Sequence, residues 1–158
     1  MLAHHYVTAL ELERALGREN DALAGKTRGA LRAAGDRARS LQAYVAAAKY
    51  YGDALGLAPP DAERRDLLFL QASALFRAHA ENRRNVLEQA RDALLEAQDV
   101  ERAAELEVAL AEVYWVDGEH GRVWEHLERA LGLVARQAAD RGEGARAVTG
   151  REASHARV

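Results

Sequence analysis

Alanine accounts for 35 of the 158 residues of this chain, and this content constrains the fold more than any other feature. Alanine has the highest helix propensity, because its side chain loses no rotamer freedom in a helix. The chain has only two prolines, and its two Trp, five Tyr and two Phe give little support for strands. The composition therefore excludes a β-rich fold and predicts helices whose small side chains allow close approach.

Charge and cysteine content limit the classes of function. Lys and Arg number 22 against 25 Asp and Glu, so the chain lacks the basic excess of a protein that binds nucleic acid phosphates. The absence of cysteine excludes thiol catalysis, disulfides and cysteine-based zinc sites. No apolar run approaches the ~18 residues of a membrane span, and the N-terminus lacks the basic start of a signal peptide. We therefore expect a soluble, cytoplasmic, all-α protein without a nucleic acid or membrane partner.

Apolar residues recur at helical spacing through most of the chain and predict seven helices. The predicted helices cover residues 2–17, 20–40, 43–57, 61–80, 82–97, 100–117 and 119–136. Pro59 and Pro60 end the third helix, because neither can continue it. The expected N-caps of the next three helices are Asp61, Asn82 and Asp99.

The last 22 residues, 137–158, have no periodic apolar side chains and are rich in Gly, Arg and Glu. Such a segment cannot bury enough apolar surface to offset the entropy lost on ordering. We therefore expect a folded domain over residues 1–136 and a disordered tail over residues 137–158.

Pairs of small or apolar residues recur at similar intervals in three blocks of the sequence. The pairs are Gly35 and Ala47, Ala72 and Val86, and Ala111 and Val123, separated by 12, 14 and 12 residues. These spacings resemble the tetratricopeptide repeat, a helical hairpin with a period of about 34 residues. On this register Gly35 and Asp36 lie inside the second helix. A second interpretation, in which they end one helix and begin another, stays open.

The resemblance implies a right-handed α-solenoid of three tetratricopeptide-like hairpins. The hairpins would cover residues 20–60, 61–98 and 99–136, after an orphan helix over residues 1–17. Helices would cross closely at the small residues Gly35, Ala47, Ala54, Ala72, Ala93, Ala111 and Ala130. Larger gaps between units would be filled by Tyr51, Tyr114 and Leu127.

Residues 1–136 resemble, more narrowly, the helical-repeat region that follows the ATPase module in bacterial STAND-class signalling proteins. This group includes adenylate cyclase-like proteins and LuxR-type regulators, and the resemblance rests on runs such as LAHHYVTALELERALG and ALRAAGDRARSLQAYVAAAKYYGDAL. It implies a non-catalytic sensing module that binds a protein, a peptide or a neighbouring domain. The chain would be a fragment or truncated paralogue of such a regulator, and a stand-alone adaptor is the alternative.

A partner groove lined by the first helix of each hairpin is also implied by the resemblance. The candidate groove residues are Arg32, Asp36, Arg39, Phe69, Ser73, Phe76, Arg77, Glu112 and Trp115. Arginine and aromatic side chains anchor many protein interfaces. In the alternative interpretation, Phe69, Phe76 and Trp115 only pack between helices.

Gly25, Lys26 and Thr27 resemble the end of a phosphate-binding loop and suggest a nucleotide-binding switch as an alternative function. That loop also requires a glycine five residues before Gly25, where this chain has Asn20. It further requires a preceding strand, and the sequence predicts a helix there. The match is therefore better explained as a coincidence within a helix.

Histidines and serines do not form a recognisable catalytic or metal-binding motif. His4 and His5 are adjacent and would point about 100° apart on a helix, and His120 and His126 are six residues apart. No serine lies in the GxSxG motif of a hydrolase. We therefore expect no catalytic residue, no cofactor and no metal site.

The final helix of the predicted array has an apolar side that nothing in the sequence covers. Trp124 lies on it beside Leu127 and Leu131, and the polar tail offers no capping helix. The uncapped hairpin predicts that the chain belongs to a longer array or forms a homodimer through this end.

Overall fold

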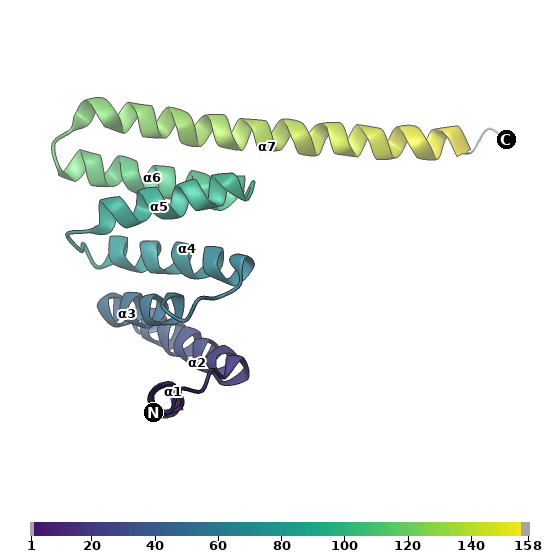
Figure 1. Cartoon of the computed structure of the whole chain (residues 1–158). Coiled ribbons are helices and arrows are strands. Elements are labelled where there is room, and N and C mark those ends of the chain that lie inside the picture. Colours follow the sequence, from purple (N-terminus) through teal and green to yellow (C-terminus); the bar gives the residue numbers. More distant parts are fainter. Residues whose placement is uncertain (1, 156–158) are drawn as a thin grey trace. The chain divides into compact units, whose positions relative to one another are not determined.

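The computed structural model describes the backbone of residues 2–155 and the side chains of residues 3–141. Over the described backbone the chain forms seven α-helices and no strand (Figure 1). They are α1 (Leu2–Ala15), α2 (Asp21–Ser40), α3 (Tyr44–Leu55), α4 (Asp61–Arg77), α5 (Arg83–Glu96), α6 (Val100–Val116) and α7 (His120–His155). The all-α class and the existence of each predicted helix are confirmed.

Each of the first six helices is followed by one residue in the left-handed region of backbone space. These residues are Gly17, Gln42, Ala58, His79, Gln98 and Gly118, with φ between 47° and 79°. In five of the six turns the next backbone N–H donates to a carbonyl five residues earlier, as Asp99 does to Leu94 at 2.9 Å. This geometry satisfies carbonyl groups at the helix end and reverses the chain within a few residues.

The predicted N-caps are confirmed at Asp99 and wrong at Asp61. The Asp99 side chain accepts from the backbone N–H of Arg102. Pro60 instead holds the cap position of α4, and its carbonyl accepts from the N–H of Arg64 at 2.8 Å. Proline suits this place because its φ of −56° is compatible with a helix start, and Asp61 becomes the first helical residue.

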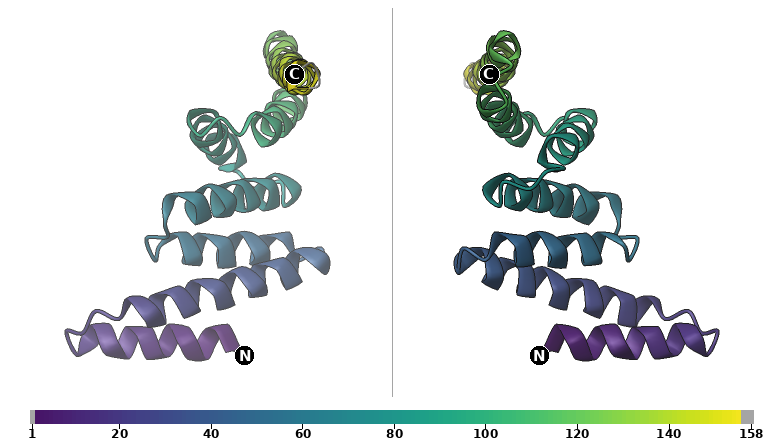
Figure 2. Two further views of the ribbon diagram at one scale, coloured as in Figure 1. Left: turned by 90° about the vertical axis from the view of Figure 1, so that its right-hand side faces the viewer. Right: turned by 90° about the vertical axis from the view of Figure 1, so that its left-hand side faces the viewer.

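The chain divides into two compact units, residues up to Ala93 and residues from Leu94 onward, so that the division falls within α5. In the first unit, α1 packs on α2, α2 on α3 and α3 on α4, as the successive layers of Figure 2 show. Its buried core is Ala3, Leu31, Ala34, Ala38, Ala47, Ala48, Tyr51, Ala54, Leu67 and Ala74. The alanines of the sequence thus serve close packing as well as helix formation.

Gly35 lies inside α2, which is continuous from Asp21 to Ser40, so the interpretation that divides this helix is wrong. The residue is buried against Tyr51 of α3. A Cβ atom added at Gly35 would lie 2.5 Å from Cε1 and 2.8 Å from Cδ1 of the Tyr51 ring. The close helix crossing predicted at Gly35 is therefore present between α2 and α3.

In the second unit, α6 packs against α7. The α7 side chains buried at this contact recur at intervals of three and four residues, and they are Val123, His126, Ala130 and Leu133. Helical spacing in the sequence groups Val123, Leu127, Ala130, Leu131 and Val134 into one predicted apolar stripe, but Leu131 and Val134 are exposed. The error arose because two apolar stripes run side by side along this helix.

The seventh helix is longer than the sequence predicts. It continues beyond Arg136 to His155, so the structure shows helix where the sequence predicts an irregular tail, and residues 156–158 lie outside the described range. No proline follows Pro60, and alanines at 138 and 139 favour continuation of the helix. The Arg141 guanidinium also lies 3.6 Å from the Glu101 carboxylate. This ion pair connects this part of α7 to α6.

Candidate functional site

The predicted groove residues of α2 contact other side chains of the first unit. Arg32 Nη1 lies 3.4 Å from Asp66 Oδ2 of α4, and one turn earlier Arg28 Nε lies 3.1 Å from Glu63 Oε2. These two ion pairs follow the same order along both helices, so α2 and α4 are joined by a short ladder of charges. Arg32 is therefore already engaged with α4, with about 40% of its side chain exposed.

Asp36 connects α2 to the core through Tyr51. The Tyr51 hydroxyl donates to Asp36 Oδ1 at 2.8 Å, and Arg39 Nη2 lies 3.9 Å from the same oxygen. Burial, together with the Asp36 carboxylate, raises the pKa of Tyr51 to about 12. Asp36 thus has a structural role in holding a buried tyrosine hydroxyl.

The raised pKa of Tyr51 predicts a loss of stability at alkaline pH. The unfolded state ionises near the ordinary tyrosine pKa of about 10, and the folded state resists ionisation to about 12. The contribution is therefore complete below pH 10 and disappears as the pH rises from 10 to 12. We expect Tyr51→Phe to cost about 1 kcal/mol at pH 8 and to unfold with a weaker pH dependence above pH 10. Urea unfolding at pH 8, 10 and 11 measures both effects, and identical pH dependence in the two proteins would contradict the prediction.

The other candidate residues fall on α4 and α6. Phe69, Ser73 and Phe76 of α4 are each half-buried, and the exposed Arg77 guanidinium lies 5.9 Å from the Phe76 ring centroid. Glu112 and Trp115 belong to α6 in the second unit, and both are exposed. Trp115 packs its ring on His120 at a centroid distance of 4.7 Å. The nine candidates thus belong to two separate units, and their combination in one groove stays a prediction.

The residues that resemble a phosphate-binding loop lie inside a helix. Gly25, Lys26 and Thr27 belong to α2, and Thr27 is fully buried. Its hydroxyl donates to the Leu23 carbonyl at 2.7 Å and lies 3.4 Å from the Tyr6 carbonyl. A hydroxyl buried against backbone carbonyls is placed for packing between α1 and α2 and does not face a phosphate.

A groove with a volume of about 790 Å³ runs along α6 and α7 in the second unit. Its apolar lining is Ala104 and Val108 from α6 with Trp124, Leu127, Ala130, Leu131 and Val134 from α7. Trp124 and Leu131 are 69% and 70% exposed, although side chains of this size are usually buried in a stable helix pair. The stripe Trp124, Leu127, Leu131 and Val134 has spacings of three, four and three residues, the pattern by which one helix packs against another.

The polar rim of this groove is acidic. Its charged members are Glu101, Glu105, Glu128 and Arg141. Arg141 pairs with Glu101 at 3.6 Å. Glu105 and Glu128 are exposed and leave the groove with an excess of negative charge.

A buried ionisable pair lies between α6 and the face of α7 that packs against it, and the sequence analysis did not predict this pair. His126 Nδ1 lies 2.5 Å from Glu107 Oε2 of α6, and both side chains are less than 5% exposed. The His126 ring stacks on Tyr114 at a centroid distance of 4.9 Å, and Arg122 donates to the Tyr114 hydroxyl at 3.1 Å. The position of Glu107 in the sequence could have indicated its burial. Glu107 lies four residues after Ala103 and three before Leu110, and these two residues lie on the buried face of α6.

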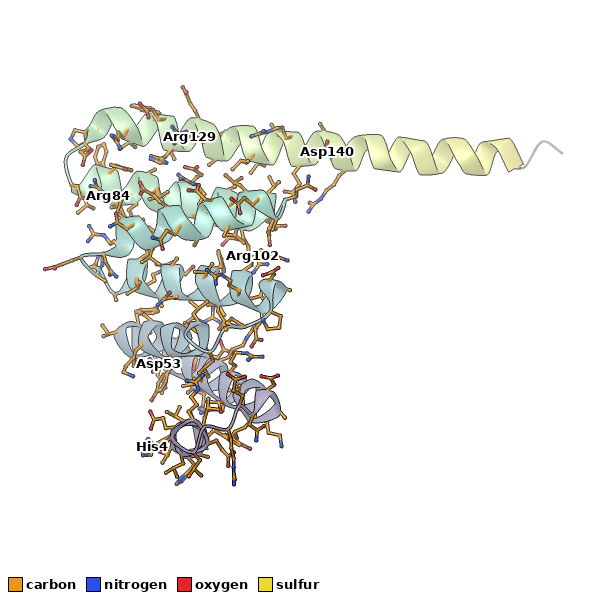
Figure 3. All side chains as sticks on the ribbon, in the orientation of Figure 1. His4, Asp53, Arg84, Arg102, Arg129 and Asp140 are labelled. Carbon is orange, nitrogen blue, oxygen red and sulfur yellow. The ribbon has the colours of Figure 1, made fainter. Side chains whose placement is uncertain are left out.

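A second cavity, of about 1010 Å³, borders Glu107 in the same unit. Its lining includes Glu107, Leu133, Arg129 and Asp140, the last two of which Figure 3 labels along α7. The lining carries four carboxylates, of Glu107, Glu125, Glu128 and Asp140, against two guanidinium groups, of Arg129 and Arg136.

Among the described side chains, no three His, Asp or Glu residues converge in a way that could hold a metal ion. Within the same range, no helix combines the length and the apolar character that crossing a membrane requires. Comparisons with models of known protein families, with curated protein sequences and with solved structures give no match. The resemblance to tetratricopeptide repeats therefore stays a prediction from the sequence.

Proposed function

We propose that this chain is a non-catalytic protein-interaction module and that the groove along α6 and α7 is where a partner binds. The observation that carries the proposal is the exposed stripe Trp124, Leu127, Leu131 and Val134. Contiguous apolar surface on a folded protein usually marks an interaction site, because leaving it in water is unfavourable. Binding a partner there would remove that surface from water without requiring any catalytic residue.

The regulatory setting of the proposal rests on the sequence. Helical hairpins that resemble tetratricopeptide repeats would form a solenoid, acting in the cytoplasm as the sensing part of a bacterial signalling protein. Support within the first unit comes from the close crossing of Gly35 and Tyr51 and from the Arg28–Glu63 and Arg32–Asp66 ladder. A neighbouring domain of a longer regulator and a separate protein are both suitable partners.

Site-specific photocrosslinking tests the proposal in cells that produce the protein. A benzophenone amino acid at Leu131 is expected to give discrete protein adducts, because this position faces the groove. The matched control is the same amino acid at Val45, which is 74% exposed on α3 and outside the groove. A second substitution, Val134→Asp, should abolish the Leu131 adducts. Equal adducts at both positions, or none at Leu131, would overturn the proposal.

The nucleotide-binding alternative predicts a different result. If Gly25, Lys26 and Thr27 formed a phosphate site, ATP titrated into the purified chain would release or absorb heat of binding. We expect a silent titration, because these residues lie inside α2.

A further inference from the structure

We propose that the groove along α6 and α7 binds an amphipathic α-helix whose apolar stripe is flanked by Lys or Arg side chains. This inference rests on the proposed function and adds the chemistry of the partner. It follows from the shape of the groove, the spacing of its apolar residues and the charge of its rim.

The backbone hydrogen bonds of a bound segment favour a helix in this groove. The floor of the groove is made of apolar side chains from two packed helices, and its polar groups lie at the rim. An extended peptide laid on this floor would bury N–H and C=O groups that the floor cannot satisfy. A helix satisfies these groups internally, and it presents side chains at the three- and four-residue spacing of the α7 stripe. The groove therefore favours a helix over an extended segment.

The charge of the groove rim favours a partner with basic side chains. Glu101, Glu105 and Glu128 line the rim against a single cation, Arg141, which already pairs with Glu101. Lysine or arginine beside the apolar stripe of a partner would lie opposite Glu105 and Glu128. Acidic flanks would meet like charge, which opposes binding and slows association.

The same charges argue against a second copy of this chain as the occupant. In a two-fold symmetric dimer each copy presents the same surface to the other. Glu105 and Glu128 of one copy would then approach an equally acidic rim. A dimer would lack the complementary charge that a basic helix supplies.

Synthetic helical peptides of about 18 residues test the proposal with the full chain. One peptide carries leucines at helical spacing with lysine flanks, one carries the same leucines with glutamate flanks, and one has its leucines spread around the helix. The protein carries Trp115→Phe, so that Trp124 is its only tryptophan and reports on the groove by fluorescence. We expect the basic peptide to bind about tenfold more tightly than the acidic one at low salt, and the third peptide not to bind.

Charge reversal provides the control. Glu105→Lys combined with Glu128→Lys should invert the preference, so that the acidic peptide binds more tightly. Glu96→Lys changes an exposed carboxylate of α5 that does not line the groove and should leave the preference unchanged. Leu131→Asp should remove binding of both peptides, and circular dichroism verifies that each variant stays helical.

The outcomes separate this inference from the proposed function. Equal binding of the basic and acidic peptides would overturn the proposed basic flanks of the partner. Absence of binding by all three peptides would overturn the proposal that the partner is a helix. In either case, Leu131-specific adducts in cells would still support the proposed function. A dimer in sedimentation that Leu131→Asp dissociates would show that a second copy fills the groove, and it would also overturn the inference.

Discussion

Gly35→Ala is expected to destabilise the protein by about 2 kcal/mol, even though alanine is the better helix former. In an exposed helix interior this substitution would stabilise by about 1 kcal/mol. Here the new methyl group would lie 2.5 Å from the Tyr51 ring, which is fully buried and anchored through its hydroxyl to Asp36. The ring cannot move aside cheaply, so overpacking exceeds the gain in helix propensity.

Gly29 supplies the matched control in the same helix. A Cβ added at Gly29 meets no atom within 4 Å, so Gly29→Ala should stabilise by up to about 1 kcal/mol. Urea unfolding of both variants gives the two changes with opposite signs. Removing the obstacle with Tyr51→Leu should make Gly35→Ala harmless in that background. Equal effects of the two glycine substitutions would show that α2 and α3 do not approach closely at Gly35.

His126→Leu is expected to lower the free energy of unfolding by about 3 kcal/mol or more. The substitution removes the imidazole that contacts Glu107, whose side chain is less than 5% exposed. Removing one partner of a buried ionisable pair typically costs about 3–5 kcal/mol, because the remaining group is shielded from water and has lost one of its contacts.

The double variant Glu107→Leu with His126→Leu separates this penalty from the loss of side-chain volume. Two leucines replace the pair by apolar contacts, and we expect most of the lost stability to return. The control is His120→Leu on the same helix, where the side chain is exposed and the change should stay within about 0.5 kcal/mol. Additive losses in the double variant, measured by the same unfolding method, would show that the two side chains are not coupled.

Helical periodicity predicted the elements of this fold because local spacing determines them. Pro59 and Pro60, Gly17 and Gly118 mark chain reversals that any sequence analysis can find. The turns at Gln42 and Gln98 use the same left-handed geometry without glycine, so only the end of the apolar pattern indicates them. The crossing at Gly35 was predictable because only glycine leaves room for Tyr51.

The candidate site was predicted only in part, since it depends on which face of each helix is covered. The exposed apolar side of the last helix, with Trp124 and Leu131, follows from the sequence and is confirmed. The burial of Glu107 in the core does not follow from the sequence, because a carboxylate in a helix is normally expected to be exposed to solvent. Its contact with His126 depends on which face of α7 is turned toward α6, and no local sequence pattern specifies that orientation.

The two stripes of α7 differ in register by a single residue. Val123, His126, Ala130 and Leu133 face α6, and the residue after each of them, Trp124, Leu127, Leu131 and Val134, lines the groove. Successive residues point about 100° apart on a helix. A saturation scan of α7 would therefore give two phenotypes at adjacent positions. Substitutions at the residue that faces α6 should reduce protein abundance. Substitutions at the next residue, which lines the groove, should abolish partner binding and leave abundance unchanged.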